Sequence, residues 1–375
     1  MFKLMSVWGA LLLAHGAVQA APQAEALRLE VVAKGLDRPW AVAFLPGGEF
    51  LVSERPGALR VVSARGDIGA PIAGLPAVDF AGQGGLLDVV LDRDFARSRA
   101  LSLCFTEPGS GQDSGKNGTA LARAKLNAAG TALEDLRVIF RQQPKMEGRH
   151  HFGCRVVESA DGRQLFLTLG ERYKGMQQAQ TLDNHLGKVV RVDKSGQVPA
   201  DNPFVRTPGA LPEIYSLGHR NPQGALLDAQ GQLWVHEHGP QGGDEINRVL
   251  PGRNYGWPVI TYGENYGGGA IGEGLKAKPG LEQPAWQWTP SIAPSGFAQI
   301  TSDAYGAAWK GSFVVGSLKF RQVQRIAAAA EEGRLGPPEV LIEDIGRVRD
   351  VRQGPDGFIY VLTEDAPGQL LRLKR

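Results

Sequence analysis

The stretch WAVAFLPGGEFLVS, residues Trp40–Ser53, places two runs of alternating apolar residues on either side of a tight Gly-Gly turn. Period-2 alternation around a glycine-containing turn is typical of a β-hairpin. The same pattern recurs five more times along the chain, more loosely in some copies. The further copies are Gly85–Phe105, Cys154–Thr168, Gln223–His236, Ser295–Val315 and Val348–Leu362.

The spacing of these six repeats indicates the fold. Their starts lie roughly 45 to 75 residues apart, which is room for about four short strands with their loops, the size of a propeller blade. An ordinary β-sandwich would account for the strands, but not for six similar units. We therefore predict an all-β, six-bladed β-propeller with four-stranded antiparallel blades. Helical periodicity is scarce, and we interpret the best helix candidate, Ile326–Arg334, as a loop.

The first 20 residues have the layout of a secretory signal peptide. Lys3 supplies an early positive charge, an apolar stretch follows around Val7–Leu13, and Val18 and Ala20 are small residues at the −3 and −1 positions. The apolar stretch is too short to span a bilayer, and a buried N-terminal helix is the alternative. We expect cleavage after residue 20, one propeller domain over residues 21–375, and a periplasmic or secreted protein without stable membrane insertion.

Composition narrows the class of protein further. The 50 Gly and 24 Pro are spread along the chain, as expected for many short strands separated by turns. A formal net charge of +2 gives no indication of a nucleic-acid partner or of a membrane surface. The two cysteines, Cys104 and Cys154, are too few for a disulfide scaffold; they form one bridge or remain thiols, and the sequence leaves both open.

Segments rich in polar and basic residues lie between the repeats. Because each adjoins a repeat core, we expect them to meet at one mouth of the propeller channel. These segments are Arg149–Gly153, Leu217–Gly224, Glu237–Pro240, Gly242–Asn247, Asn254–Pro258, Ser317–Lys319 and Gly346–Asp350.

The residue types in these segments suit an anionic ligand, a base and a metal. Arginine and lysine bind carboxylates, histidine is a general base near neutrality, and carboxylates with Gly-Pro carbonyls suit calcium. Each fragment alone also has an ordinary structural explanation. Asp244-Glu245 is more often a surface turn than a metal site, and at most one of His150 and His151 should face the channel.

Together these segments resemble the soluble pyrroloquinoline-quinone (PQQ) dependent glucose/sorbosone dehydrogenase family, most closely its aldose sugar dehydrogenase branch. The similarity extends from about Leu36 to Leu373. It is carried by GHRNPQG at residues 218–224 and by the long run over residues 237–258. Independent matches follow in the same order at Gly82–Leu87, Asp201–Phe204 and Arg347–Val351.

The resemblance implies oxidation of a broad range of aldose sugars at C1 to lactones, with electrons passed to an external acceptor such as a quinone or dye. The family's base opens a His-Phe-Gly-X-Arg stretch, which makes it His151 here, and Arg155 closes that stretch. Arg220 would stabilise negative charge on the reduced cofactor. The PQQ-binding positions that the resemblance implies are Gln83, His151, Arg220, Asn221, Gln223, Lys319, Arg347 and Arg349.

The resemblance also implies calcium. The carbonyl oxygens of Gly239 and Pro240 match ligands of a calcium ion that contacts PQQ and acts as a Lewis acid. Glu245 and the Tyr255 carbonyl match a second, structural calcium site. The residue types agree with a PQQ site. PQQ carries three carboxylates, which require several cations, and protein side chains cannot accept hydride, so a redox cofactor is needed.

Two positions depart from the family pattern. His150 stands where relatives usually have Asp or Asn, which would alter the base or the sugar contacts. Cys154 stands where glycine is usual, which would narrow the site or place a thiol near the quinone.

Two other functions fit parts of the pattern. A calcium-dependent lactonase or esterase on a six-bladed propeller also pairs calcium with histidines, but it has no use for the cations Lys319, Arg347 and Arg349. A non-catalytic binding propeller would be marked by loss of the base or of these cations, and neither is lost.

Overall fold

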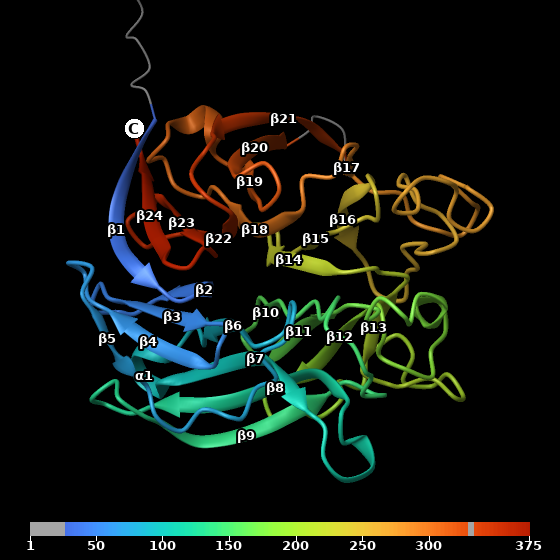
Figure 1. Cartoon of the computed structure of the whole chain (residues 1–375), viewed down its shortest axis with the longest axis horizontal. Helices are drawn as coiled ribbons and strands as arrows, with labels where there is room; N and C mark the ends of the chain where they lie inside the picture. Colours follow the sequence, from blue (N-terminus) through green and yellow to red (C-terminus); the bar gives the residue numbers. More distant parts are fainter. Residues whose placement is uncertain (1–26, 329–333) are drawn as a thin grey trace, which may run out of the picture.

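The computed structural model describes residues 27–328 and 334–375. Its strands form six four-stranded antiparallel sheets arranged as a ring, which confirms the predicted propeller (Figure 1). Each predicted repeat supplies the two innermost strands of one blade, and the first strands of neighbouring blades contact one another around the centre.

The blades follow one another along the chain. Blades one to three consist of β2 (Pro39–Phe44), β3 (Phe50–Glu54), β4 (Ala58–Val62), β5 (Ile68–Pro71); β6 (Leu86–Leu91), β7 (Ala100–Pro108), β8 (Asn117–Leu126), β9 (Leu133–Arg141); β10 (Val156–Glu158), β11 (Gln164–Leu169), β12 (Lys188–Asp193), β13 (Ile214–Leu217). Blades four to six consist of β14 (Pro222–Leu227), β15 (Leu233–Glu237), β16 (Asp244–Val249), β17 (Trp286–Trp288); β18 (Pro294–Gln299), β19 (Phe313–Ser317), β20 (Gln322–Ala328), β21 (Leu335–Ile342); β22 (Val348–Gln353), β23 (Ile359–Thr363), β24 (Gly368–Lys374), β1 (Arg28–Leu36).

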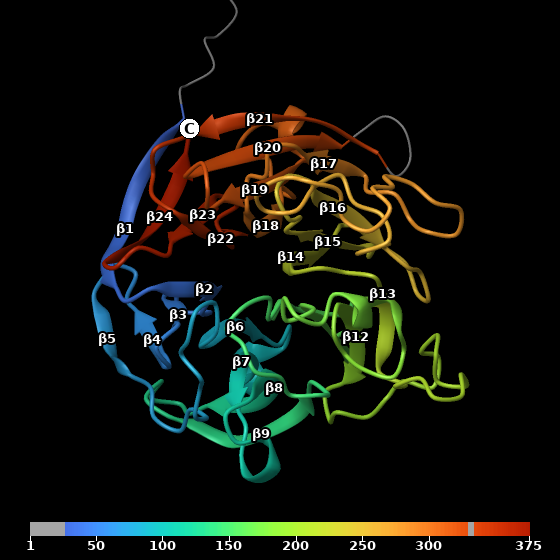
Figure 2. The same ribbon diagram turned by 45° about the vertical axis from the view of Figure 1, so that its right-hand side comes forward.

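The last blade is completed by the first strand of the chain. β1 pairs antiparallel with β24, with Arg28 opposite Lys374, and the two lie side by side in both ribbon views (Figures 1 and 2). The repeat pattern did not predict this pairing, because β1 lies outside all six repeats.

Helices are few and short in the part of the chain that the structure describes. They are α1 (Phe95–Ser98) and the 3₁₀ turns at Gly111–Asp113, Gln177–Gln180 and Ala307–Trp309. The predicted loop at Ile326–Arg334 is wrong in its first three residues, which extend β20 because they pair with β21. The proposed signal peptide, residues 1–20, lies outside the described residues.

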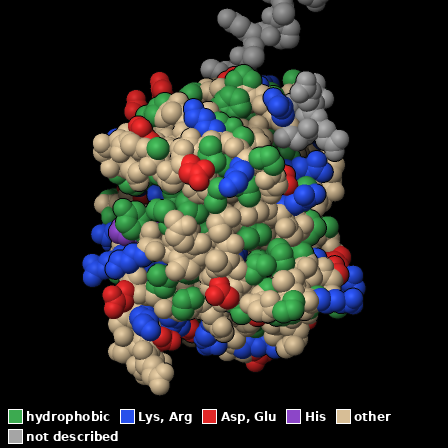
Figure 3. Space-filling model, turned by 90° about the vertical axis from the view of Figure 1, so that its right-hand side faces the viewer, with side chains coloured by type: hydrophobic (Ala, Val, Ile, Leu, Met, Phe, Trp, Pro, Cys, Tyr) green, Lys and Arg blue, Asp and Glu red, His purple; other side chains and the backbone are tan. Residues whose placement is uncertain are grey.

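The surface carries charges of both signs. Figure 3 shows Lys and Arg side chains interspersed with Asp and Glu on the face that lies at the right of Figure 1. Among the residues that the structure describes, no helix is long and apolar enough to cross a membrane.

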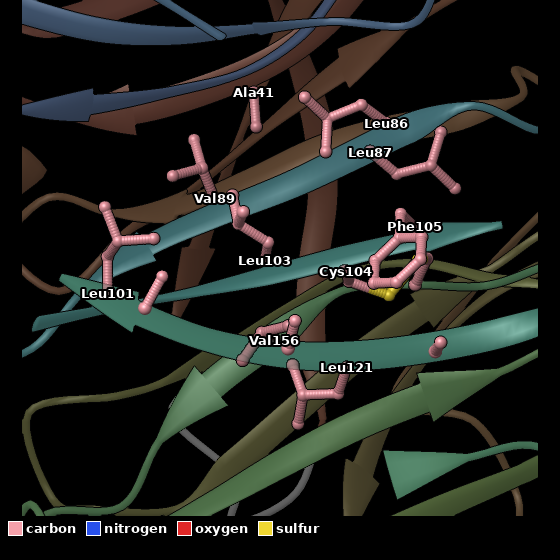
Figure 4. Packing of buried hydrophobic residues seen from close by; sticks show 14 of the residues in the cluster. Ala41, Leu86, Leu87, Val89, Leu101, Leu103, Cys104, Phe105, Leu121 and Val156 are labelled. Atoms are coloured by element: carbon pink, nitrogen blue, oxygen red, sulfur yellow. A yellow bond between two sulfur atoms is a disulfide. The ribbon is translucent and has the colours of Figure 1, made fainter. Parts of the chain in front are cut away.

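The largest hydrophobic cluster joins blades one, two and three. Within it Cys104 on β7 forms a disulfide with Cys154, which decides the question that the sequence left open. Both cysteines are fully buried, and Figure 4 shows the sulfur atoms beside Phe105, among apolar side chains of β6, β7 and β10. The bridge therefore connects the core of blade two to the segment that leads into blade three.

Three buried charges and one half-buried charge, that of Arg352, connect the innermost strands. Arg155 pairs with Asp88 at 3.1 Å and with Asp350 at 3.2 Å, and Arg352 pairs with the same two carboxylates at 2.9 and 3.0 Å. Removing any one of the four would leave an uncompensated buried charge. This network fixes blades two, three and six relative to one another below the site described next.

Candidate active site

One end of the ring gathers the chain segments that flank the repeats. In each blade the first two strands are antiparallel, so the start of the first lies opposite the end of the second, as Pro222 lies opposite Glu237. Residues just before a first strand and just after a second strand therefore share one face of the propeller. The predicted residues in such positions are Gln83, His151, Arg220, Asn221, Gly239, Pro240, Lys319 and Arg347.

His151 is held through both its ring and its backbone. Its Nδ1 lies 3.0 Å from Glu171 Oε1, and its backbone N–H donates to Gln83 Oε1 at 2.8 Å. Because a carboxylate only accepts, the neutral ring carries its proton on Nδ1 and leaves the Nε2 lone pair free. Nε2 has no hydrogen-bond partner among the described residues. His151 is thus oriented as a base, and Glu171, which the sequence analysis missed, orients it.

The surroundings of His151 also set its pKa. Burial disfavours the imidazolium and holds the pKa of His151 below its ordinary value. The hydrogen bond that Nδ1 donates to Glu171 acts in the opposite direction, while the positive charge of Arg220 adds to the lowering. The neutral, proton-accepting form of His151 therefore persists to lower pH than it does in a free histidine.

The two departures from the family pattern have different surroundings. His150 is exposed, whereas His151 is buried. Cys154 is bonded to Cys104, and no cysteine among the described residues is free. The hypothesis of a thiol near the cofactor is therefore wrong, because the sulfur is already engaged.

A cavity of about 340 Å³ at this end carries an excess of positive charge. Its lining includes the guanidinium groups of Arg55, Arg347 and Arg349 but a single carboxylate, that of Glu364. Glu364 accepts from Arg347 Nε at 2.8 Å and from Arg349 Nε at 2.7 Å. One carboxylate cannot neutralise three guanidiniums, so the cavity suits an anionic ligand.

The pKa values of the lining residues reflect this imbalance. Burial and the nearby charge of Arg349 lower the pKa of Arg55 to about 10. Burial alone would raise the pKa of Glu364, but the positive charges of Arg349 and Arg347 outweigh burial and lower that pKa overall. A bound anion would relieve the repulsion among the three cations.

A chain of side-chain amides continues from the cations toward the base. Gln223 Oε1 accepts from Arg349 Nη1 at 2.9 Å, and Gln223 Nε2 donates to Asn221 Oδ1 at 3.2 Å. The backbone N–H of Gly153 also donates to Asn221 Oδ1, at 3.3 Å. Asn221 Nδ2 is buried without a partner among the described residues, so a donor is left over for a ligand.

Arg220 lies between the base and the predicted calcium ligands. Its Nη1 donates to the carbonyl oxygens of Gly239 at 2.6 Å and of His238 at 3.2 Å. Its Nε is buried and has no partner among the described residues. Arg220 therefore supplies a second unsatisfied donor, one that carries a positive charge.

A wider cavity of about 780 Å³ adjoins the cationic one and is lined by Gly239, Pro240 and Lys319. The two cavities share His238 and Ala293. Burial holds the pKa of His238 well below its ordinary value, and its Nε2 lies 2.7 Å from the Pro294 carbonyl oxygen. A neutral, fixed imidazole therefore separates the cations from the Gly-Pro loop.

Glu245 and Tyr255 line a third, very small pocket together with Glu237. Its volume of about 10 Å³ holds a single water-sized particle. Burial and the negative charge of Glu237 raise the pKa of Glu245 to about 8. A cation in this pocket would relieve the repulsion between the two carboxylates.

The structure thus places most of the predicted residues in three adjoining pockets. Gln83, Gln223, Arg347 and Arg349 line the first, Lys319 the second and Glu245 and Tyr255 the third; Gly239 lines both the second and the third. His151 and Asn221 line none of the three, but each is hydrogen-bonded to a residue that lines the first, His151 to Gln83 and Asn221 to Gln223. His238 lines all three and was not among the predicted residues. Arg55, Glu171 and Glu364 were also missed, although each lies within two residues of the end of a second strand.

A family model described as glucose/sorbosone dehydrogenase matches residues 36–372.

The chain belongs to the glucose/sorbosone dehydrogenase family.

It is accordingly an oxidoreductase, and the resemblance seen in the sequence is confirmed. It is 43% identical over 364 residues to aldose sugar dehydrogenase YliI of Escherichia coli, covering 95% of each chain. The apo-form crystal structure of the soluble aldose sugar dehydrogenase of E. coli matches with a TM-score of 0.86 and 41% identity, over 93% of this chain and 99% of that one. A PQQ-bound aldose sugar dehydrogenase of Streptomyces coelicolor matches with a TM-score of 0.75 and 28% identity, over 94% and 99%.

Proposed function

We propose that this glucose/sorbosone dehydrogenase oxidises aldose sugars at C1 to lactones, using PQQ and calcium, and passes the electrons to an external acceptor. The observation that carries the proposal is the cavity with three guanidinium groups and one carboxylate, beside the oriented base His151. The PQQ-bound state of the Streptomyces relative supports the choice of anion.

PQQ fits the donors and charges that the site leaves unsatisfied. Its three carboxylates would be held by Arg347, Arg349 and Lys319, with Arg55 adding to the positive charge of the cavity. The unpartnered buried donors of Arg220 and Asn221 would contact the remaining polar atoms.

Calcium fits the oxygen donors at two places. The carbonyl oxygens of Gly239 and Pro240 would hold one ion; each accepts a hydrogen bond, from Arg220 and Ser291 respectively, and each has a second lone pair. The Glu245 carboxylate and the Tyr255 carbonyl would hold the second ion, in the smallest pocket.

The chain's own residues would manage the proton and the charge. His151 Nε2 would take the proton of the C1 hydroxyl, and Glu171 would stabilise the resulting imidazolium through Nδ1. The guanidinium of Arg220 would stabilise negative charge that develops next to it. When bound, PQQ supplies the acceptor for the hydride that leaves C1, a role that no side chain can fill.

We further propose a periplasmic or secreted location, which rests on the signal-like residues 1–20. A broad range of aldoses agrees with the width of the cavity beside Lys319. A calcium-dependent lactonase or esterase would hold calcium mainly through side-chain carboxylates and amides, and it would have no use for the cations Lys319, Arg347 and Arg349. No group of three or more His, Cys, Asp or Glu suited to a metal occurs among residues 27–328 and 334–375.

The test begins with protein freed of cofactor and metal by chelation. PQQ is titrated with and without calcium, and reduction of a dye by glucose and other aldoses is followed. We expect activity only with both additions, and we expect His151→Ala to abolish activity while PQQ still binds. His185→Ala, which removes another buried histidine that lines none of the three pockets, should stay active. Failure of PQQ to bind in the presence of calcium would overturn the proposal, and lactone hydrolysis would be assayed next.

A further inference from the structure

Two loops that precede and follow the first hairpin of blade three are locked together. The residues of interest are His150 and His151 in one loop, and Arg172 and Tyr173 in the other. Arg172 is almost fully buried and donates to the carbonyl oxygens of His150 at 3.1 Å, Gly148 at 3.0 Å and Asn117 at 2.9 Å. It also lies over the Phe152 ring.

The backbone of these loops adopts a costly conformation. His151, Arg172 and Tyr173 have φ values of 54°, 62° and 65°, in the left-handed region that side-chain-bearing residues rarely occupy. Gly170 lies so close to His151 that a Cβ there would stand 2.2 Å from the His151 carbonyl oxygen. Backbone strain persists only where surrounding contacts impose it, and it concentrates at functional sites. Here the side-chain contacts of Arg172 join the two loops, and Tyr173 follows it directly in the chain.

Tyr173 lies beside the base but remains largely in solvent. Its ring centroid is 5.4 Å from that of His151 and 5.9 Å from that of His150. It is 52% exposed, whereas His151 is 6% exposed. The Tyr173 hydroxyl makes no hydrogen bond to any described residue, and Tyr173 lines none of the three pockets. An apolar ring and a free hydroxyl therefore lie beside the base and face solvent.

We propose that Tyr173 is a specificity-determining residue that contacts the sugar as its C1 hydroxyl reaches His151. This inference rests on the proposed function. Sugars present C–H faces that pack against aromatic rings, and their hydroxyls bond to a phenol such as that of Tyr173. His150 is exposed beside Tyr173 and adds a second aromatic ring to the surface that the sugar would contact.

The experiment compares Tyr173→Asn with Tyr173→Phe. Asparagine tolerates the left-handed conformation and so keeps the backbone while removing the ring. We expect Tyr173→Asn to raise KM for glucose about 3- to 10-fold, the usual worth of an aromatic contact, with kcat little changed. Tyr173→Phe should give a smaller rise, because it loses only the hydroxyl. Val340→Ala, at an exposed position on the outer strand β21, serves as the control.

Two further readouts separate this role from a structural one. PQQ affinity, measured by quenching of tryptophan fluorescence, should be the same in all variants, since Tyr173 does not line the cationic cavity. The acidic limb of the kcat/KM profile, which reports on His151, should keep its position. If Tyr173→Asn instead lowers kcat and shifts that limb with KM unchanged, Tyr173 only supports His151 and the proposal is overturned.

Direct binding distinguishes failure of this proposal from failure of the proposed function. Contact of glucose with the cofactor-free protein is followed by saturation-transfer NMR in the wild type, Tyr173→Asn and Val340→Ala. Weaker glucose signals in Tyr173→Asn alone support the contact, even if no turnover with PQQ is found. Equal signals in the three proteins overturn it, even if the wild type proves to be a PQQ dehydrogenase.

Discussion

Removal of the Cys104–Cys154 disulfide should destabilise the propeller by a calculable amount. The two cysteines are 50 residues apart in sequence. Closing a loop of that length lowers the entropy of the unfolded chain and so raises its free energy by about 4 kcal/mol at 25 °C. With an unfolding entropy of about 2.1 cal/mol/K per residue, that loss lowers Tm by about 5 °C in a protein of this size.

The backbone at Cys154 refines this expectation. Its φ of 82° lies in the left-handed region, which costs a residue with a Cβ about 1 kcal/mol or more relative to glycine. The double variant Cys104→Ala with Cys154→Gly should therefore be more stable than Cys104→Ala with Cys154→Ala, by about 1 kcal/mol. Both should be less stable than the oxidised wild type.

The measurement is urea unfolding of the three proteins followed by circular dichroism, with Tm from calorimetry. The wild type is measured with and without a thiol reductant as a control, because the variants should not respond to reductant. Equal stability of the oxidised wild type and the alanine double variant would refute the loop-entropy argument. A glycine variant no more stable than the alanine variant would refute the argument from φ.

Three further predictions concern the site. Glu171→Gln removes an interaction that raises the pKa of His151, so the acidic limb of kcat/KM should move to lower pH while kcat falls about 100-fold or more. Glu364→Gln leaves the positive charges of Arg347 and Arg349 without their shared carboxylate, so the Tm of the apo-protein should fall. Because the pKa of Glu364 is lowered in the folded protein, the difference in Tm between wild type and variant should be present above about pH 4.3. It should vanish as pH falls through the lowered pKa. Arg349→Gln should weaken PQQ binding at least 10-fold in calorimetry, with the acidic limb of His151 unmoved.

The fold could be predicted because its signal is local and repeated. Each of the six hairpins carries its own alternation and turn, as in Trp40–Ser53, so six weak indications support one another. β1 could not be predicted in the same way. Its pairing with β24 joins residues more than three hundred positions apart and leaves no local pattern.

The site was predictable where long motifs carry it and not elsewhere. Arg220 and Asn221 lie in a distinctive seven-residue run, whereas Glu171 and Glu364 are single carboxylates near strand ends. A search for polar residues just after the second strand of each blade would have found them, since the end of that strand lies at the same face of the propeller in every blade. His151 is buried while its neighbour His150 is exposed because the backbone at His151 is left-handed and two loops pack closely there. An alternating pattern of apolar residues cannot reveal either feature.

The closure of the ring by β1 has a consequence for how the protein is made. Translation delivers Arg28 more than three hundred residues before Lys374, yet these two residues are neighbours in the finished blade. Until β24 emerges, β1 has no partner strand and the sixth blade stands open at its edge, where another chain could pair with it. A nascent chain that stalls or is cut before residue 368 therefore keeps five complete blades and an unprotected edge, and it is this shortened product, more than any point variant, that should aggregate.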